Sequence, residues 1–171
     1  MKVLISEAEL QARIDELGAA ISKDYKGTRP VLICVLKGAV FFIADLARRL
    51  RFDVEIEFMA VSSYGASTES SGVVRILKDL DTDIEGRHVL IVEDIIDSGQ
   101  TLEYLVRSLK ARNPASLEIV TLLSKPSRRT AQLDCRYTGF EIPNEFAVGY
   151  GLDYGEKYRN LPYLGVVDDP E

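Results

Sequence analysis

The amino-acid sequence predicts an α/β fold with a mostly parallel central sheet flanked by helices. Short apolar runs such as Val31–Leu36 and Val89–Val92 have the length and composition of strands that are buried on both faces. Segments with helical spacing of apolar residues alternate with these runs along the chain. This alternation favours helices packed on a parallel sheet. Because no repeat or linker interrupts the 171 residues, we expect residues 1–171 to form a single domain.

The first predicted element is an amphipathic helix over residues 6–23. Ser6 and Glu9 have the spacing of a capping box, in which each residue bonds the backbone of the other. Apolar residues then recur at helical spacing, namely Leu10, Ile14, Leu17 and Ile21. Gly27 and Pro30 end this region, since neither residue favours continuation of a helix.

The later elements follow from similar patterns. After the strand at 31–36, the residues Lys37-Gly38 turn the chain into a helix over 39–50. The segment YGASTESSG at 64–72 has no large aliphatic residue, so we expect an exposed, mobile loop there. The other predicted elements are strands at 54–63, 73–77, 89–92 and 117–123, a helix at 102–111, and strand-like pieces near 135–140, 145–151 and 163–167.

Composition excludes several classes of protein. The net charge is −6, whereas proteins that bind nucleic acid or anionic membranes in general are usually basic. A small anionic ligand stays possible because local charge can oppose the net charge. The start of the chain has too few apolar residues for a signal peptide or a membrane span. With one His and two Cys, of which Cys34 lies in an apolar run, we expect neither zinc nor disulfides, and a cytoplasmic protein.

The segment Val89–Thr101, VLIVEDIIDSGQT, carries the strongest chemical signal. An apolar strand delivers two adjacent carboxylates, Glu93 and Asp94, and DSGQT follows directly before a helix. Small residues and a glycine allow backbone N–H groups to converge on an anion, and the helix N-terminus adds a favourable dipole. The alternative is that Asp97 or Ser98 only caps the helix, which leaves the two acids unexplained.

The same segment resembles the phosphoribosyl-pyrophosphate motif of type I phosphoribosyltransferases. That motif has apolar residues, two acids, two apolar residues and then D-S/T-G-x-T. The resemblance covers nearly the whole chain, and its hypoxanthine-guanine branch is matched by these segments: LKGA at 36–39, SSYG at 62–65, LLSKPSRR at 122–129 and GFEIPNEFAVGYGLDYGEKYRNLPY at 139–163.

The resemblance implies a purine salvage enzyme with a small hood region and a flexible lid loop. Such an enzyme joins a 6-oxopurine, hypoxanthine or guanine, to phosphoribosyl pyrophosphate with the help of Mg²⁺, through an oxocarbenium-like transition state. It implies that Glu93 and Asp94 bind the ribose hydroxyls directly or through Mg²⁺, and that Asp97 is the acid/base residue facing purine N7. The 5′-phosphate would be held by Asp97, Ser98, Gly99, Gln100 and Thr101.

The remaining site residues are also implied by the resemblance. Lys37 and Gly38 correspond to the pyrophosphate loop, whose preceding peptide bond is often cis in the family, and Arg159 to a further pyrophosphate contact. Asp153 corresponds to a second Mg²⁺ site. Gln100 departs from the lysine of some relatives, which removes a charge beside the phosphate.

The purine side of the site is implied in the same way. Lys125 corresponds to the donor to the purine 6-oxo group, Phe146 to the aromatic that stacks on the base, and Ala147 to a backbone contact. Ser63 and Tyr64 begin the polar lid, which would exclude water. Taken singly, Phe146 also suits a core position and each cation a solvated surface.

Two alternatives remain open from the sequence. One is a non-catalytic nucleotide-binding regulator on the same fold, although no basic face or added nucleic-acid-binding segment is evident. The other is a phosphoribosyltransferase for xanthine or adenine, of which Lys125 disfavours adenine because a donor would face the exocyclic amine. The preference between hypoxanthine and guanine is open, and a homo-oligomer, dimer or tetramer, is implied by the resemblance alone.

Overall fold

A computed structural model describes residues 1–63 and 74–168 and confirms the α/β fold. The larger sheet has the strand order β4-β3-β2-β5-β6-β7. Its neighbouring strands run parallel except for β3 and β4, which are antiparallel. The strands of this sheet are β2 Val31–Leu36, β3 Glu55–Ser63, β4 Val74–Lys78, β5 His88–Ile96, β6 Ser116–Ser124 and β7 Tyr137–Glu141.

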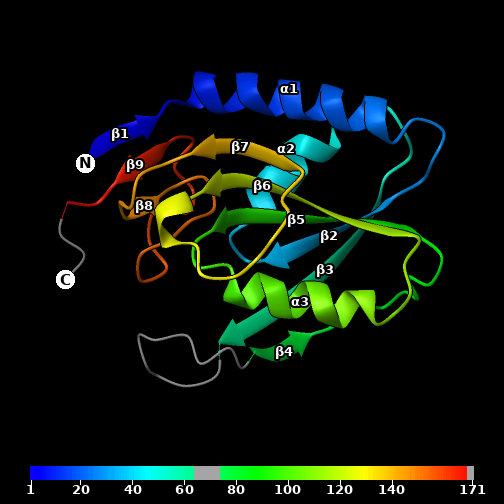
Figure 1. Cartoon of the computed structure of the whole chain (residues 1–171). Helices are drawn as coiled ribbons and strands as arrows, with labels where there is room; N and C mark the ends of the chain where they lie inside the picture. The colour runs from blue at the N-terminus through cyan, green and yellow to red at the C-terminus, as the bar shows by residue number, and fades with distance from the viewer. Residues whose placement is uncertain (64–73, 169–171) are drawn as a thin grey trace.

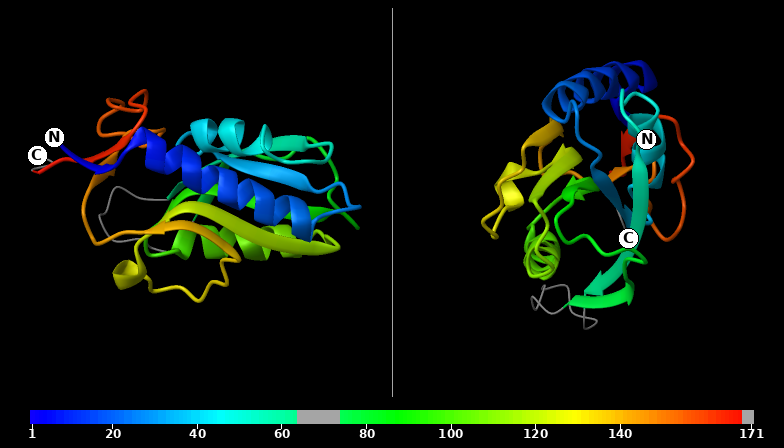
Figure 2. Two further views of the ribbon diagram at one scale, coloured as in Figure 1. Left: turned by 90° about the horizontal axis from the view of Figure 1, so that it is seen from above. Right: turned by 90° about the vertical axis from the view of Figure 1, so that its right-hand side faces the viewer.

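Helices cover both faces of this sheet. Helix α1 (Glu7–Asp24) and helix α2 (Val40–Ala47) lie on one face, and helix α3 (Gln100–Lys110) lies on the other (Figures 1 and 2). The capping box is present: Ser6 Oγ accepts from Glu9 N at 3.1 Å, and Glu9 Oε1 accepts from Ser6 N at 3.2 Å. These bonds satisfy backbone donors that the first turn of α1 cannot satisfy itself.

The central strand β2 explains the unbroken apolar run of the sequence. Leu32 and Cys34 belong to the core cluster formed with α1 and α2, whereas Val31 and Ile33 belong to the cluster formed with α3. All four side chains are fully buried. Because successive side chains of a strand point to opposite faces, a strand covered on both sides has no position for a polar residue.

A smaller antiparallel sheet forms the hood, with the order β1-β9-β8. It is built from β1 (Lys2–Ile5), β8 (Ala147–Val148) and β9 (Leu164–Val166), and it lies beyond the carboxyl ends of the parallel strands (Figure 1). No sequence pattern predicts β1, and the pattern at 145–151 predicts a longer strand than the observed β8. Both differences have one cause: these short strands pair across the chain and depend on contacts that no local pattern encodes.

Two boundaries matter for the site. Strand β5 continues to Ile96, so Glu93 and Asp94 lie within the strand and not beyond its end. Helix α3 begins at Gln100, two residues earlier than the sequence predicts.

Strand β3 ends at Ser63, while Tyr64 and the rest of the predicted lid at 64–72 lie outside the described residues. Within residues 1–63 and 74–168, no helix has the length and apolar character needed to cross a bilayer.

Candidate functional site

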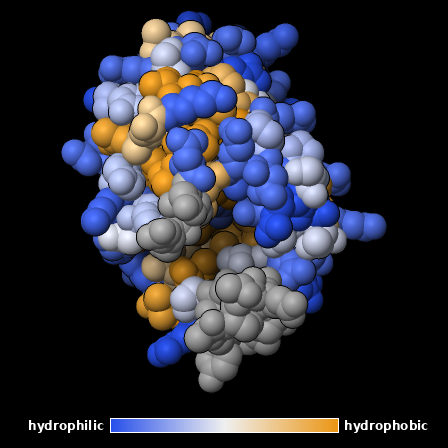
Figure 3. All heavy atoms as spheres, turned by 90° about the vertical axis from the view of Figure 1, so that its left-hand side faces the viewer, coloured by the Kyte–Doolittle hydropathy of each residue, from blue (hydrophilic) through white to orange (hydrophobic). Residues whose placement is uncertain are grey.

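Predicted site residues from the turns after β2, β5 and β6 lie at the carboxyl ends of the parallel strands, on the side of the hood. Figure 3 shows this end of the molecule, where apolar surface gathers in the upper part and the surface is hollowed below it. The turns that follow β2, β5 and β6 meet here because parallel strands all end at the same edge. Two cavities open at this edge, and Asp97 lines both of them.

The acid pair is buried in β5. Glu93 is 9% exposed, and its neighbour Asp94 accepts a 2.6 Å hydrogen bond from Ile95 N. Burial raises the pKa of Glu93 well above its ordinary value, and the charge of Asp94 raises it further. Burial also raises the pKa of Asp94, although hydrogen bonds from Glu93 and Ile95 oppose this change. Two buried carboxyls of this kind favour a cation or a ligand hydroxyl beside them.

The Lys37-Gly38 turn packs directly on this pair. The Leu36–Lys37 peptide bond is cis. A Cβ built on Gly38 would lie 1.7 Å from Asp94 Oδ2, so only a glycine leaves room for the carboxylate. On its other side, Gly38 contacts Gly151, where a Cβ would lie 2.1 Å from Gly38 O. Gly151 has φ of +100°, which also favours glycine.

Arg159 closes this side of the site. Its Nη1 donates to Gly151 O at 2.7 Å, and its Nη2 lies 3.3 Å from Asp153 Oδ1 and 2.9 Å from Glu156 Oε1. Lys37 Nζ lies 3.5 Å from Glu156 Oε2. Lys37 and Arg159, two of the expected pyrophosphate residues, are therefore joined through Glu156, while Gly38, the third, packs on Asp94.

The turn between β5 and α3 has the form of an anion cradle. Gly99, with φ of +86°, is the N-cap residue of α3, so neither Asp97 nor Ser98 caps the helix. Ser98 Oγ accepts a long 3.4 Å hydrogen bond from Gln100 N. A helix N-terminus presents N–H groups without intrahelical acceptors and favours a negative group. The adjoining cavity, about 240 Å³ in volume, is lined by Val35, Glu93, Ile95, Ile96, Asp97, Ser98, Gly99, Thr101 and Leu102.

A short 3-10 helix after β6, Pro126–Arg128, brings cations to Asp97. Lys125 is 7% exposed, and its Nζ lies 3.9 Å from Asp97 Oδ2. Arg128 Nε donates to Asp97 Oδ1 at 3.0 Å. Lys125 N donates to Ile96 O at 3.0 Å, which ties this segment to the end of β5.

Arg128 and Arg129 were not predicted as site residues from the sequence. Arg129 Nη2 donates to Ser124 Oγ at 2.7 Å, and its Nε donates to Asp97 O at 3.2 Å. Arg129 thus fixes the backbone that carries Asp97, while Arg128 contacts the carboxylate itself. The basic sequence KPSRR was the available signal, but it does not show which cation faces Asp97.

The larger cavity lies between Asp97 and the hood. It has a volume of about 570 Å³ and is lined by Asp97, Lys125, Arg128, Asn144, Glu145, Phe146, Val166, Val167 and Asp168. The Phe146 ring is 40% exposed and meets Tyr154 edge to face, with ring centroids 5.5 Å apart. Ala147 pairs with Val166 across the hood sheet. An exposed aromatic residue and a buried cation that line one cavity suit a flat ligand with a polar edge.

The structure does not bring all the predicted metal ligands into one cluster. Within the described part of the chain, no group of three or more His, Cys, Asp or Glu side chains is arranged to hold a metal ion. Glu93 and Asp94 lie in β5, whereas Asp153 is paired with Arg159 in a separate loop. These are two partial sites, each of which offers carboxylate oxygens.

Comparison with known proteins agrees with this geometry. The phosphoribosyl transferase domain matches residues 6–155. A hypoxanthine-guanine phosphoribosyltransferase of Bacillus subtilis is 57% identical over 97% of this chain and 92% of its own length. A protein of the same name from Mycobacterium avium is 58% identical over 97% of this chain and 85% of its own length.

Solved structures give the same result. A hypoxanthine phosphoribosyltransferase of Staphylococcus aureus superposes with a TM-score of 0.95 at 50% identity, over 97% of this chain and 90% of that chain. A hypoxanthine-guanine phosphoribosyltransferase of Bacillus anthracis, with a HEPES molecule in its active site, has a TM-score of 0.94 at 49% identity, over 98% of both chains. The chain therefore belongs to the phosphoribosyl transferase domain family, in its hypoxanthine-guanine phosphoribosyltransferase branch.

Proposed function

We propose that this chain transfers the phosphoribosyl group of phosphoribosyl pyrophosphate to hypoxanthine and guanine. The products would be IMP or GMP and pyrophosphate. One observation supports the proposal more strongly than any other: Asp97 lies between a buried cation, Lys125, and the anion cradle at the start of α3. This arrangement would hold a base and a sugar phosphate on either side of a single carboxylate. The names of relatives with identities of 57% and 58% support the same activity.

In the proposed reaction a purine ring nitrogen forms a bond to the anomeric carbon as the bond from that carbon to pyrophosphate breaks. The electron pair of the broken bond leaves with pyrophosphate. Asp97 accepts the proton that the base releases at N7, and general base catalysis of this kind contributes roughly 10²–10⁴-fold. Lys125 donates to the 6-oxo group, Phe146 stacks on the base, and the backbone of Ala147 contacts its edge.

We assign the other half of the site to the sugar and its phosphates. The turn from Asp97 to Thr101 would hold the 5′-phosphate with backbone N–H groups and hydroxyls. The turn at Lys37-Gly38 and the Arg159 guanidinium would hold pyrophosphate, where they oppose its negative charge. Ser63 and Tyr64 would begin a lid, and water excluded by it could not attack an oxocarbenium-like centre.

Mg²⁺ fits this site as a partner of the substrate. Mg²⁺ usually keeps several waters and binds through one or two carboxylates together with substrate phosphates. Glu93 and Asp94 would supply such a pair, and Asp153 would supply a second position. When bound, the ion would neutralise charge that develops on the leaving pyrophosphate. The partial protein sites are thus those expected for an ion that arrives with phosphoribosyl pyrophosphate.

The test is an activity panel with hypoxanthine, guanine, xanthine and adenine, each with phosphoribosyl pyrophosphate, in the presence of Mg²⁺ and of excess EDTA. We expect turnover with hypoxanthine and guanine and its loss in EDTA. Turnover with only xanthine, or with only adenine, would show that the base assigned here is wrong. No turnover with any base, together with tight binding of IMP, would instead indicate a nucleotide-binding regulator.

We further propose that residues 1–171 act as one domain in the cytoplasm and form a homo-oligomer, a dimer or a tetramer. The free thiols of Cys34 and Cys135 suit a reducing compartment. Light scattering coupled to size-exclusion chromatography will give the mass in solution, and a mass of one 19.1 kDa chain would contradict the oligomer.

A further inference from the structure

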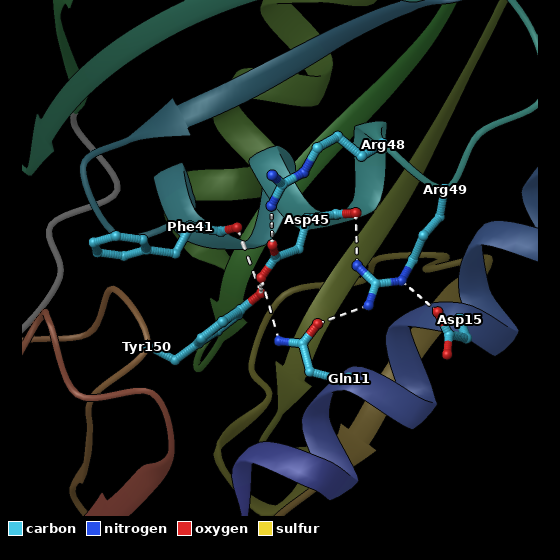
Figure 4. Close-up of polar contacts among 7 residues, drawn as sticks. All are labelled: Gln11, Asp15, Phe41, Asp45, Arg48, Arg49 and Tyr150. Atoms are coloured by element: carbon cyan, nitrogen blue, oxygen red, sulfur yellow. Dashed lines mark hydrogen bonds and ion pairs between the residues drawn. The ribbon is translucent and has the colours of Figure 1, made fainter.

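A buried tyrosine beside the site reaches away from it and into the protein. Tyr150 follows β8, is 6% exposed and is the residue directly before Gly151. Its hydroxyl donates to Asp45 Oδ2 in a very short hydrogen bond, and it also lies 3.4 Å from Phe41 O (Figure 4). Asp45 and Phe41 both belong to α2, so Tyr150 joins its own loop to that helix.

Asp45 is held by further donors. Gln11 Nε2 of α1 donates to Asp45 Oδ2 at 3.3 Å, and Arg48 Nη2 donates to Asp45 Oδ1 at 2.6 Å. Burial acts to raise the pKa of Asp45, but hydrogen bonds from Tyr150, Arg48 and Gln11 outweigh it and lower the pKa. Burial, together with the same hydrogen bond, raises the pKa of the Tyr150 phenol. The carboxylate therefore stays charged and the phenol stays a donor at neutral pH.

Arg49 adds further hydrogen bonds to this group of residues. Its guanidinium donates to Gln11 Oε1 at 2.7 Å, to Asp15 Oδ1 at 2.5 Å and to Asp45 O at 2.9 Å (Figure 4). The fork of a guanidinium fixes three acceptors in one geometry. Helices α1 and α2 are thus joined at the point where Tyr150 attaches.

Helix α2 also carries the first half of the pyrophosphate side. It begins at Val40, directly after the Lys37-Gly38 turn, and Val40 N donates to Lys37 O at 3.1 Å. The second half is the loop from Gly151 to Arg159, which contacts Gly38 O and is held by the bond from Arg159 Nη1 to Gly151 O. The hydrogen bond between Tyr150 and Asp45 connects these two halves on the side that faces away from the site.

We propose that Tyr150 and Asp45 form a positioning pair for the pyrophosphate side of the site, an inference that rests on the proposed function. Neither side chain has to touch substrate. Their hydrogen bond holds the Gly151–Arg159 loop against the turn that carries Lys37 and Gly38. Its loss would leave the purine side, which is built from Asp97, Lys125 and the hood, in place.

The first test is Tyr150→Phe, with Tyr137→Phe as its matched control. Tyr150→Phe keeps the ring, whose centroid lies 6.4 Å from that of Phe41, and removes only the hydroxyl. Tyr137 is 7% exposed and donates a 2.6 Å hydrogen bond to Asp24, so the control loses a bond of the same kind. Tyr137 lies on β7, and Asp24 ends α1 away from the site.

We expect Tyr150→Phe to weaken binding of Mg²⁺-phosphoribosyl pyrophosphate about tenfold, because a hydrogen bond to a charged group is lost. Binding of IMP, which lacks pyrophosphate, should change less than about twofold. Tyr137→Phe should change neither affinity, while both variants lose similar thermal stability. Calorimetric titration of each protein with each ligand gives these values.

The second test combines Tyr150→Phe with Asp45→Asn. If the two residues act as one pair, the double variant binds Mg²⁺-phosphoribosyl pyrophosphate no more weakly than the weaker single variant. Equal weakening for IMP and for phosphoribosyl pyrophosphate, additive losses in the double variant, or an equal loss in Tyr137→Phe would each overturn the pair. Turnover of the unchanged protein is measured first, and no turnover with any base would contradict the proposed function. If the unchanged protein turns over its bases and Tyr150→Phe binds Mg²⁺-phosphoribosyl pyrophosphate as well as it does, only the positioning pair is contradicted.

Discussion

Asp94 lies so close to the backbone of Gly38 that a Cβ on Gly38 would stand 1.7 Å from Asp94 Oδ2 and 2.7 Å from its Cγ. This contact joins two segments that the sequence separates, the turn after β2 and the acid pair of β5. The expected pyrophosphate turn therefore packs directly on one of the expected ribose and Mg²⁺ ligands. Any side chain at Gly38 must displace the carboxylate.

Gly38→Ala should therefore lower kcat/KM about 100-fold, since a displacement of about 1 Å in a reacting geometry can have that effect. The fold should survive, because Gly38 lies in a turn and outside the helices and strands of the core. Gly27→Ala is the control for steric contact: Gly27, unlike Gly38, has a positive φ, +82°, and no heavy atom lies within 4 Å of its added Cβ. That variant should lose about 1 kcal/mol of stability and keep its activity. Full activity in Gly38→Ala would contradict the tight contact.

Replacing Glu93 by Gln together with Asp94 by Asn should abolish most activity without unfolding the protein. The two carboxyls are buried side by side, and burial of charge costs free energy when no cation is present. The amides keep the shape but bind Mg²⁺ poorly, so we expect about a 100-fold loss of turnover or more. Thermal unfolding should be cooperative and no less stable than in the unchanged protein. Loss of cooperative unfolding would show that the acids are structural.

Asp97→Asn should lower turnover more than it weakens nucleotide binding. The amide can still accept from Arg128 Nε, which lies 3.0 Å from Asp97 Oδ1, but it cannot take up a proton. We expect a decrease of about 10²–10⁴-fold in the chemical step. Single-turnover kinetics with IMP affinity measured in parallel will separate the two effects. An unchanged chemical step removes Asp97 from the role of general base.

Lys125→Met should remove the preference for 6-oxopurines while phosphoribosyl pyrophosphate binds nearly as before. The Lys125 ammonium is buried, and an amine at C6 would face it with a second donor in place of an acceptor. Sites built on such a contact can reject the wrong ligand by about 10⁴-fold or more. The measurement is the ratio of kcat/KM for hypoxanthine to that for adenine. Arg128→Met, which removes a more exposed cation from the same cavity, should leave the ratio nearly unchanged. A ratio that survives Lys125→Met would contradict the role of Lys125.

The stability contributed by Asp45 should depend on pH in a defined direction. Its pKa in the folded protein lies below the ordinary value of 3.8, so the folded state binds this proton less tightly than the unfolded chain does. The stability that Asp45 contributes is therefore complete above about pH 3.8 and is lost as the pH falls through the lower pKa of the folded state. Urea unfolding of the unchanged protein and of Asp45→Asn should differ by about 1 kcal/mol at about pH 7 and 5, and by less at about pH 3. A difference that grows in acid would refute this sign.

Much of the architecture follows from local patterns. The run VLICVL predicts β2 at its observed bounds, because a strand buried on both faces needs apolar residues at every position. Ser6 and Glu9 predict the start of α1, because a capping box acts within one turn. The segment EDIIDSGQT predicts an acid pair followed by an anion cradle at a helix start, although the strand runs further and the helix begins earlier than the pattern suggests.

The tertiary structure decides how the two halves of the site are held. The hydrogen bond between Tyr150 and Asp45 joins residues that are 105 positions apart, and the Arg128 contact with Asp97 spans 31. The pairing of β1 with β9 likewise joins the two ends of the described chain. A sequence shows these residues as ordinary members of a helix, a turn or an edge strand. Their partners are set by how the sheet and its helices pack, and periodicity within one element carries no information about another element far along the chain.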